Sequence, residues 1–426
     1  MSPFGQRAAR AAYSALLVLL KPDYVLRLWW RGRAEPLYRH AVGERLGDYR
    51  GAPSQGWVWV HAVSLGETRA CAALIEQLRS LQPGMRLLLT HSTATGREAG
   101  AGLLREADRQ AWLPYDTPGV VERFFAQFRP AVGVLMETEI WPNLLLAAQD
   151  HGVPMVLANA RLSEKSYAQG QRLAAVLQPA VRSLALVLAQ TEDDAQRLRS
   201  SGAPQVLVSG NLKFDMTPSA AQLVQGRAWR DLLPRGVVLA ASTREGEEAL
   251  LLAAWRQLAA PRPLLLIVPR HPQRFDEVAA MVRAAGLTLA RRSTWGETPA
   301  AESLAADVWL GDSMGEMALY YATAGVALLG GSFEPLGGQN LIEAAACGCP
   351  VVMGPHTFNF AEAAQMALAG GAAVRVGDMA SGVRQALQQL GTDAHRPSSA
   401  RALAFAAQHR GAAARMAEHI VALMRH

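Results

Sequence analysis

The 426-residue sequence predicts an α/β protein of two doubly wound, Rossmann-like halves that face each other across a cleft. The chain is longer than one domain usually is, so two domains are expected. Apolar runs of strand length alternate with helical patterns, which is typical of parallel sheets covered by helices on both faces. In addition, the glycine-rich segment 328–355 joins a strand to a helix in the way that nucleotide-binding loops do.

Eleven strands are expected, six in the first half of the chain and five in the second. They cover residues 57–64, 86–92, 131–137, 154–160, 184–190, 205–211, 237–243, 263–270, 287–293, 326–331 and 350–354. Helical patterns fill the intervals, including 142–151 and the segment that begins at Leu341. Because parallel strands bring their carboxyl ends to one edge of a sheet, we expect a ligand where loops leave those ends.

The chain divides into four expected segments. Residues 1–50 form a basic N-terminal segment, 51–218 the first Rossmann-like domain and 219–398 the second, with a connection near 215–219. Residues 399–426 are a long helical pattern with no following strand. We expect this tail to pack back on the first domain.

The net charge of +6 is concentrated near the N-terminus. Residues 1–50 hold nine Arg and Lys against four Asp and Glu, so the remainder is nearly neutral. A nucleic-acid-binding protein spreads basic residues over a recognition surface, and this distribution argues against that class. Three cysteines are too few for a disulfide framework, and Cys347 and Cys349 lack the spacing of a metal site. A reducing, cytosolic environment fits.

The N-terminal segment combines an apolar stretch, residues 11–20, with flanking Arg and Lys and with Trp29 and Trp30. Ten helical residues reach only about 15 Å, half the hydrocarbon thickness of a bilayer. This pattern indicates an anchor at the membrane interface. A cleaved signal peptide is disfavoured because no small-x-small site follows, and the remaining alternative is a buried helix with exposed basic flanks.

Familiar phosphate-binding and metal-binding motifs do not occur in the sequence. There is no G-x-x-x-x-G-K-[ST] loop, no G-x-G-x-x-G after a strand and no Asp-x-Asp pair that could hold a metal on a diphosphate. A leaving phosphate would then be stabilised by cations and helix N-termini. Lys213 and Arg270 are the candidate cations.

Nine motifs occur in order over nearly the whole chain: HAVSLGE, LPYDTPG, METEIWPN, NARLSEKS, GNLKFD, VPRHPQRF, GDSMGEM, GGQNLIEAAACGCPV and MGPHTFNF. Together they resemble the 3-deoxy-D-manno-octulosonic acid (Kdo) transferases of lipid A and lipopolysaccharide core biosynthesis. The resemblance implies a GT-B glycosyltransferase whose first domain binds a lipid A precursor and whose second domain binds CMP-Kdo. It also implies inversion, no metal or cofactor, and work at the cytoplasmic face of the cell inner membrane.

The resemblance assigns roles to individual positions. It assigns Glu67 as the general base. It assigns Glu137 and Lys213 as residues that assist at the transition state. Nine further positions would bind CMP, namely Pro269, Arg270, Met314, Gly315, Glu316, Asn340, Leu341, Ile342 and Glu343. These roles agree with the chemistry, because an inverting transfer needs a base for the acceptor hydroxyl and cations for the donor's anionic groups.

Structural interpretations stand beside these roles. Ser64-x-x-Glu67, Ser313-x-x-Glu316 and Asn340-x-x-Glu343 all have the pattern of a capping box. Arg270 also suits an ordinary surface ion pair. For the whole protein, the alternatives are another GT-B enzyme, such as a UDP-sugar transferase or epimerase, and a membrane-bound scaffold that binds a nucleotide without turnover.

Overall fold

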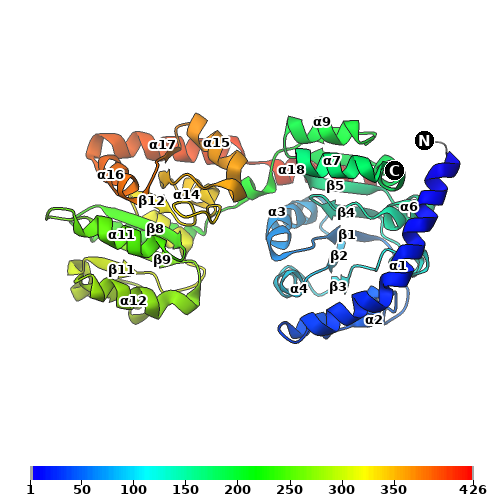
Figure 1. The fold of residues 1–426 in the computed structure, drawn as a ribbon, viewed down its shortest axis with the longest axis horizontal. Helices are drawn as coiled ribbons and strands as arrows, with labels where there is room; N and C mark the ends of the chain where they lie inside the picture. The colour runs from blue at the N-terminus through cyan, green and yellow to red at the C-terminus, as the bar shows by residue number, and fades with distance from the viewer. Residues whose placement is uncertain (1–2, 425–426) are drawn as a thin grey trace. The chain divides into compact units, whose positions relative to one another are not determined.

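The computed structural model describes residues 3–424, which form two compact units (Figure 1). The first unit contains the residues up to Asp215 together with those from Arg410 on, and the second contains Met216–His409. Each unit has a parallel sheet with helices on both faces. The α/β, doubly wound architecture expected from the sequence is therefore confirmed.

The first unit is built on a seven-stranded sheet in the order β3-β2-β1-β4-β5-β6-β7. Its strands are β1 (Trp57–His61), β2 (Arg86–His91), β3 (Arg109–Trp112), β4 (Val132–Met136), β5 (Met155–Ala160), β6 (Leu186–Ala189) and β7 (Val206–Val208). In register, Val58 of β1 lies beside Leu87 of β2 on one side and Val132 of β4 on the other. The chain order reverses between β1 and β4, which makes this point the switch point of the sheet.

Helices cover both faces of the first sheet. They are α1 (Pro3–Arg31), α2 (Val42–Arg45), α3 (Leu65–Leu81), α4 (Ala94–Ala101), α5 (Pro118–Phe128), α6 (Pro142–Asp150), α7 (Glu164–Arg172), α8 (Ala174–Arg182), α9 (Glu192–Ser200) and α18 (Ala412–Met424), with 3₁₀ turns η1 (Pro36–Arg39) and η2 (Leu212–Asp215). Helices α3 and α18 pack on one face, and α5, α6, α8 and α9 pack on the other. Proline at the first turn of α5 and of α6 suits a helix start, because its missing N–H would have no partner there.

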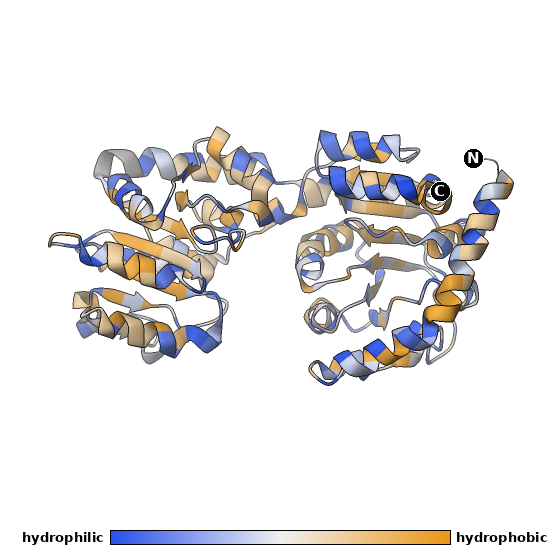
Figure 2. Ribbon diagram, in the orientation of Figure 1, coloured by the Kyte–Doolittle hydropathy of each residue, from blue (hydrophilic) through white to orange (hydrophobic). Residues whose placement is uncertain are grey.

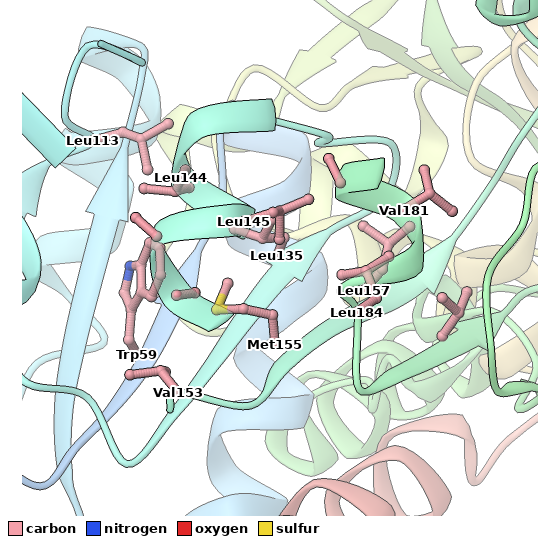
Figure 3. Packing of buried hydrophobic residues seen from close by; sticks show 14 of the residues in the cluster. Trp59, Leu113, Leu135, Leu144, Leu145, Val153, Met155, Leu157, Val181 and Leu184 are labelled. Carbon is pink, nitrogen blue, oxygen red and sulfur yellow. The ribbon is translucent and has the colours of Figure 1, made fainter. Parts of the chain in front are cut away.

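Alternate residues of each strand enter opposite cores. Trp59 and Leu135 point to the side of α5 and α6, whereas Val60 and Val134 pack against α3 and α18. Figure 3 shows the first of these cores, where Trp59, Met155 and Leu157 of the strands meet Leu144 and Leu145 of α6. Both faces are buried, which explains why these strands are continuous apolar runs.

The second unit repeats the arrangement with a parallel seven-stranded sheet in the order β10-β11-β9-β8-β12-β13-β14. Its strands are β8 (Val237–Thr243), β9 (Leu264–Pro269), β10 (Leu289–Arg291), β11 (Val308–Leu310), β12 (Val326–Leu329), β13 (Val351–Met353) and β14 (Ala373–Arg375). Its helices are α10 (Ala220–Asp231), α11 (Glu247–Arg256), α12 (Phe275–Ala284), α13 (Met317–Thr323), α14 (Leu341–Ala346), α15 (Ala361–Ala369), α16 (Met379–Leu390) and α17 (Thr392–Gln408). The switch point lies between β8 and β12.

The secondary structure departs from the sequence-based expectation in two ways. The eleven expected strands are present, but three further strands, β3, β11 and β14, were missed. The tail is two helices rather than one: α17 contacts α14 and α16 of the second unit, and only α18 returns to the first unit. The helix breaks at Gly411, whose φ of 90° is a left-handed conformation that glycine adopts easily.

Helix α1 is a single element of 29 residues that passes through Pro22 without ending. It is held by hydrogen bonds from Tyr13 to Asp116 and from Arg10 to Asn143, and it contacts α6 and α8. Of its described side chains, only Leu28 is buried, while Leu19 is 77% and Trp30 69% exposed. Figure 2 shows the apolar part of α1 in orange. The alternative of a buried N-terminal helix is therefore wrong. No helix among residues 3–424 is both long enough and apolar enough to cross a bilayer.

Candidate active site

Glu67 lies in the first turn of α3, just after the loop that leaves β1 at the first switch point. Its Oε2 accepts the backbone N–H of Val63 at 2.9 Å, and its Oε1 accepts the Ser64 hydroxyl at 3.0 Å. Ser64 is the N-cap of α3 and accepts the N–H of Glu67 at 3.4 Å. The Ser64–Glu67 pair thus caps the helix, as the pattern predicted, and this role fixes the position of the carboxylate.

The environment of Glu67 favours a carboxylate that can take up a proton. Burial raises the pKa of Glu67, and the nearby charge of Glu137 raises it further. Hydrogen bonds from Val63 and Ser64 act in the opposite direction. The side chain is only half-buried, so a substrate can reach it. A partly exposed carboxylate with a raised pKa has the properties of a general base.

Glu137 directly follows β4, on the other side of the same switch point. Its φ of 60° is left-handed, an uncommon conformation for a residue with a long side chain. The N–H of Glu137 donates to the carbonyl of Ala158 at 2.9 Å, so the sheet holds the backbone in place. Such strain costs on the order of 1–3 kcal/mol and is often found at functional sites.

Glu139 is a third carboxylate at this edge, which the sequence-based assignment left out. Burial raises its pKa to about 7, the charges of Glu67 and Glu137 add to the effect, and the hydrogen bond from Trp141 opposes it. The indole N–H of Trp141 donates to Oε2 of Glu139 at 2.7 Å. The alternation Glu-x-Glu in the loop was the available signal, since it places two carboxylates near one another.

Lys213 lies in η2, which packs against α3, the helix that carries Glu67. Asn159, at the end of β5, accepts the N–H of Leu212 at 3.0 Å through its side-chain oxygen. At the other end of η2, Asp215 accepts the N–H groups of Gly411 and Ala413. The segment that carries Lys213 is therefore anchored on both sides, within the same unit as the three carboxylates.

The second switch point is formed by close backbone contact between the loops after β8 and β12. A Cβ atom at Gly330 would lie 2.2 Å from the carbonyl oxygen of Ser242, so the position requires glycine. Gly331 has φ 69° and Ser242 has φ 55°. The glycine pair thus serves close packing between two loops at the carboxyl edge of the sheet.

Glu247 holds this glycine loop, and the sequence-based assignment missed it. Its fully buried carboxylate accepts the N–H groups of Gly331 at 2.7 Å, Phe333 at 3.0 Å and Arg244 at 2.9 Å. Burial raises the pKa of Glu247, and these three backbone hydrogen bonds lower it. An acidic residue at a helix start looks solvent-exposed in a sequence, so no local pattern separates it from Glu245.

Arg270 follows β9 at the same edge and is exposed. Its backbone N–H donates to the carbonyl of Thr243 at 2.9 Å, whereas its guanidinium has no hydrogen bond or ion pair within residues 3–424. The neighbouring Arg274 is instead paired with the buried Glu248 at 2.7 Å. Among the side chains that the structure describes, Arg270 therefore has no ion pair, and its charge is available to a ligand.

The segment Met314–Glu316 precedes α13. Met314 is 64% exposed and Gly315 has φ 80°. The carboxylate of Glu316 pairs with Arg292 at 2.8 Å and accepts the Ser313 hydroxyl. The capping box expected at Ser313 and Glu316 is wrong, because the two side chains bond to each other and neither caps the helix N–H groups.

Asn340 is the N-cap of α14, and its side-chain oxygen accepts the N–H of Ile342 at 3.0 Å. The cap predicted at Asn340 is confirmed. The side chains of Leu341 and Ile342 are buried in the second unit, so only their backbone can meet a ligand. Glu343 and the buried Pro269 complete the nine positions assigned to nucleotide binding, all of which lie in the second unit.

Solved structures share this architecture. The chain resembles a UDP-GlcNAc 2-epimerase from Neisseria meningitidis bound to UDP-GlcNAc, with TM-score 0.55 and 18% identity over 86% of this chain and 99% of that one. It also resembles a glycosyltransferase from Rickettsia africae, with TM-score 0.58 and 13% identity over 87% of this chain and 99% of that one. Two parallel doubly wound units of this kind define the GT-B class of fold.

Sequence comparison then identifies the family. The family described as 3-deoxy-D-manno-octulosonic-acid transferase (kdotransferase) matches residues 40–216. The 3-deoxy-D-manno-octulosonic acid transferase of Bordetella pertussis is 48% identical over 421 residues, 95% of this chain and 97% of that protein. The Haemophilus influenzae transferase of the same description is 34% identical over 89% of this chain and 90% of that protein. The chain belongs to the Kdo transferase family of glycosyltransferases.

Proposed function

We propose that the protein transfers Kdo from CMP-Kdo to a hydroxyl of a lipid A precursor, with inversion at the anomeric carbon and without a metal ion. The observation that carries this mechanism is the group of carboxylates at the first switch point, where Glu67 is held by a helix cap and has a raised pKa. Family membership supports Kdo transfer. The missing Asp-x-Asp pair supports the metal-independent route.

In this mechanism Glu67 removes the proton from the acceptor hydroxyl as its oxygen attacks the anomeric carbon of Kdo. The bond between that carbon and the phosphate oxygen of CMP breaks, and CMP leaves as an anion. Lys213 and Arg270 stabilise the negative charge that develops on the donor. Glu137 lies close enough to influence the charge of Glu67 and so helps to set its proton affinity.

Product analysis tests the assignment. Purified protein is incubated with CMP-Kdo and a tetraacylated glucosamine disaccharide bisphosphate, with and without EDTA, and the lipid is examined by mass spectrometry and NMR. We expect a Kdo adduct of inverted configuration, equal yields with EDTA, and release of CMP that requires acceptor. Transfer from a UDP-sugar would favour the other GT-B class, and nucleotide binding without turnover would favour a scaffold.

We further propose that α1 places the enzyme on the cytoplasmic face of the inner membrane. Its exposed Leu16, Leu19, Trp29 and Trp30 supply the apolar contact, and its Arg side chains suit anionic headgroups. Replacement of Leu19, Trp29 and Trp30 by Ser should abolish sedimentation with anionic vesicles while thermal stability stays unchanged. High salt should weaken binding of the unmodified protein, since headgroup attraction is screened within about 10 Å at 0.1 M. Salt-insensitive binding by the triple variant would contradict this role.

A further inference from the structure

A cavity of about 340 Å³ lies in the first unit, enclosed by α7, α8, α9 and the loops after β4 and β5. Its floor consists of six aliphatic side chains, Ile140, Leu157, Leu162, Leu177, Val181 and Leu198. Leu157 and Val181, labelled in Figure 3, also belong to the core, so the cavity is a continuation of the apolar interior. Its volume is at the lower end of the range of small-molecule sites, about 300–1,000 Å³.

The loop 137–141 connects this cavity to the three carboxylates. Glu137 and Glu139 belong to the carboxylate group, and Trp141 donates to Glu139. The residues between them, Thr138 and Ile140, line the cavity. One short loop therefore contributes alternate residues to the carboxylate group and to the cavity lining, which places the two features next to each other.

The mouth of the cavity carries a positive charge. Arg161, which lines it, is exposed and has no hydrogen bond or ion pair within the described part of the chain. A ligand that combines an apolar chain with an anionic head would satisfy both the floor and this guanidinium. A sugar or a nucleotide base could pair with polar side chains of the walls, such as Gln171 and Gln178, but it would also place polar groups against the aliphatic floor, where they have no partner.

The outer wall of the cavity is α7, a helix that has no buried residue. It contributes Ser166, Tyr167, Gly170 and Gln171 to the lining. The opposite wall, α8, contacts α1, whose apolar side chains are exposed. The cavity is thus bounded by a loosely packed polar helix and by a helix that touches the proposed membrane-binding element.

We propose that this cavity binds one acyl chain of the glycolipid acceptor and thereby positions the acceptor hydroxyl at Glu67. This assignment rests on the proposed function. A bilayer is as apolar as the cavity, so a chain that moves from lipid to protein gains little affinity. Its effect is to orient the sugar, and Arg161 pairs with an anionic group of the acceptor.

The test fills the cavity without touching the carboxylates. A Cβ atom at Gly170 would lie 3.9 Å from Leu177 Cδ1, so the side chain in Gly170→Phe points at the floor. Gln169→Phe adds the same ring to an exposed position of α7 that does not line the cavity, and it is the matched control. Neither change removes a buried group, so both variants should keep the wild-type melting temperature and CMP affinity.

Acceptors with short acyl chains that remain monomeric in water provide the readout. Each methylene buried from water should raise kcat/KM of the wild type about fourfold until the cavity is full. In Gly170→Phe this increase should stop at a chain at least two methylenes shorter than in the wild type. For the longer chains, kcat/KM of the variant should therefore be roughly tenfold or more below that of the wild type. Transfer to the fully deacylated disaccharide should stay unchanged in both variants, and Gln169→Phe should match the wild type on every acceptor.

Equal losses on acylated and deacylated acceptors, or none on either, would overturn the acyl site. A wild type that transfers Kdo to neither acceptor would instead refute the proposed function. An independent measurement uses an acceptor with a diazirine at the end of one acyl chain. Labelling of peptides that contain Leu177 or Leu198, lost in Gly170→Phe, supports the site, whereas labelling confined to α1 contradicts it.

Discussion

At the switch point of the first sheet three carboxylates crowd together, whereas at that of the second sheet Arg270 presents a guanidinium that has no partner within residues 3–424. Three carboxylates of the second unit are instead held by protein groups. Glu247 accepts three backbone N–H groups, Glu248 pairs with Arg274, and Glu316 pairs with Arg292. In the first unit Glu67 and Glu139 keep raised pKa values and partial exposure.

The contrast shows how one topology can serve two kinds of chemistry. In both sheets the loops meet at the carboxyl edge where the strand order reverses. Repulsion between neighbouring carboxylates raises their proton affinity, which makes the first edge suitable for proton transfer. A saturated carboxylate, Glu247, holds the glycine loop, and the guanidinium of Arg270 at the same edge makes it suitable for an anionic ligand.

The largest effect is expected at Glu67, where the first edge would lose its base. In Glu67→Gln the amide can still accept from Val63 and donate to Ser64, so the helix cap and the stability should remain. Glutamine cannot take a proton, and turnover should fall by about 10²–10⁴. Single-turnover kinetics and thermal unfolding measure the two quantities. Glu98→Gln, at an exposed position of α4 in the same unit, is the control. Near-normal turnover in Glu67→Gln would show that Glu137 or Glu139 is the base instead.

The next effect concerns Glu247, the anchor of the second edge. Glu247→Ala leaves the N–H groups of Gly331, Phe333 and Arg244 buried without an acceptor, at about 1–3 kcal/mol for each. Urea unfolding should show a loss of roughly 3 kcal/mol or more, with weakened CMP binding. Glu245→Ala, an exposed neighbour, should change little. If the two variants were equally stable, Glu247 would not be the anchor.

A smaller effect is expected at Arg270. Arg270→Ala removes a charge-assisted contact to the donor, worth about 1.5–3 kcal/mol, and should weaken CMP binding roughly 10- to 100-fold. Stability should not change, because this guanidinium has no partner in the part of the chain that the structure describes. Calorimetry with CMP makes the measurement. Arg256→Ala, at the far end of α11, should bind CMP normally, and equal affinities in both variants would remove Arg270 from the site.

The smallest effect concerns how stability and reaction rate depend on pH through the carboxylates of the first edge. The folded-state pKa of Glu139 is raised to about 7, so the folded protein binds more protons than the unfolded chain between about pH 4.5 and 7. Stability should therefore fall as pH rises through this window, and Glu139→Gln should remove part of the slope. The same change removes a charge that repels Glu67, so the acid limb of the pH–rate profile should move to lower pH. Identical profiles in the two proteins would show that Glu139 does not influence Glu67.

Much of the fold was predictable because long strands buried on both faces are continuous apolar runs, as in β1, β4 and β9. Strands β3 and β14 were not, since neither is a continuous apolar run: β3 has the sequence Arg-Gln-Ala-Trp and β14 the sequence Ala-Val-Arg. The break at Gly411 also escaped prediction. One glycine inside an apolar helical pattern is compatible with a continuous helix, and here tertiary contacts of α18 with α3 decide.

The candidate site was predictable only in part. Glu67 and Glu137 follow strands in loops of unusual composition, and the structure brings them together. Glu247 could not be found, because two of its three backbone partners, Gly331 and Phe333, are more than eighty residues away. Ser313 and Glu316 have the spacing of a capping box, but Arg292, from another segment, pairs with the carboxylate.

Helix α18 completes the first unit with the last residues of the chain. Met416 and Ile420 of α18 pack in the core beside α3. In the sequence, however, the whole second unit separates α18 from the strands of the first unit. A ribosome adds about 5–20 residues per second, so roughly 190 residues of the second unit take about 10–40 s to appear. Through that interval the nascent first unit exposes the apolar groove that α18 later fills. The second unit, although made later, is therefore the first to have all of its sequence available for folding.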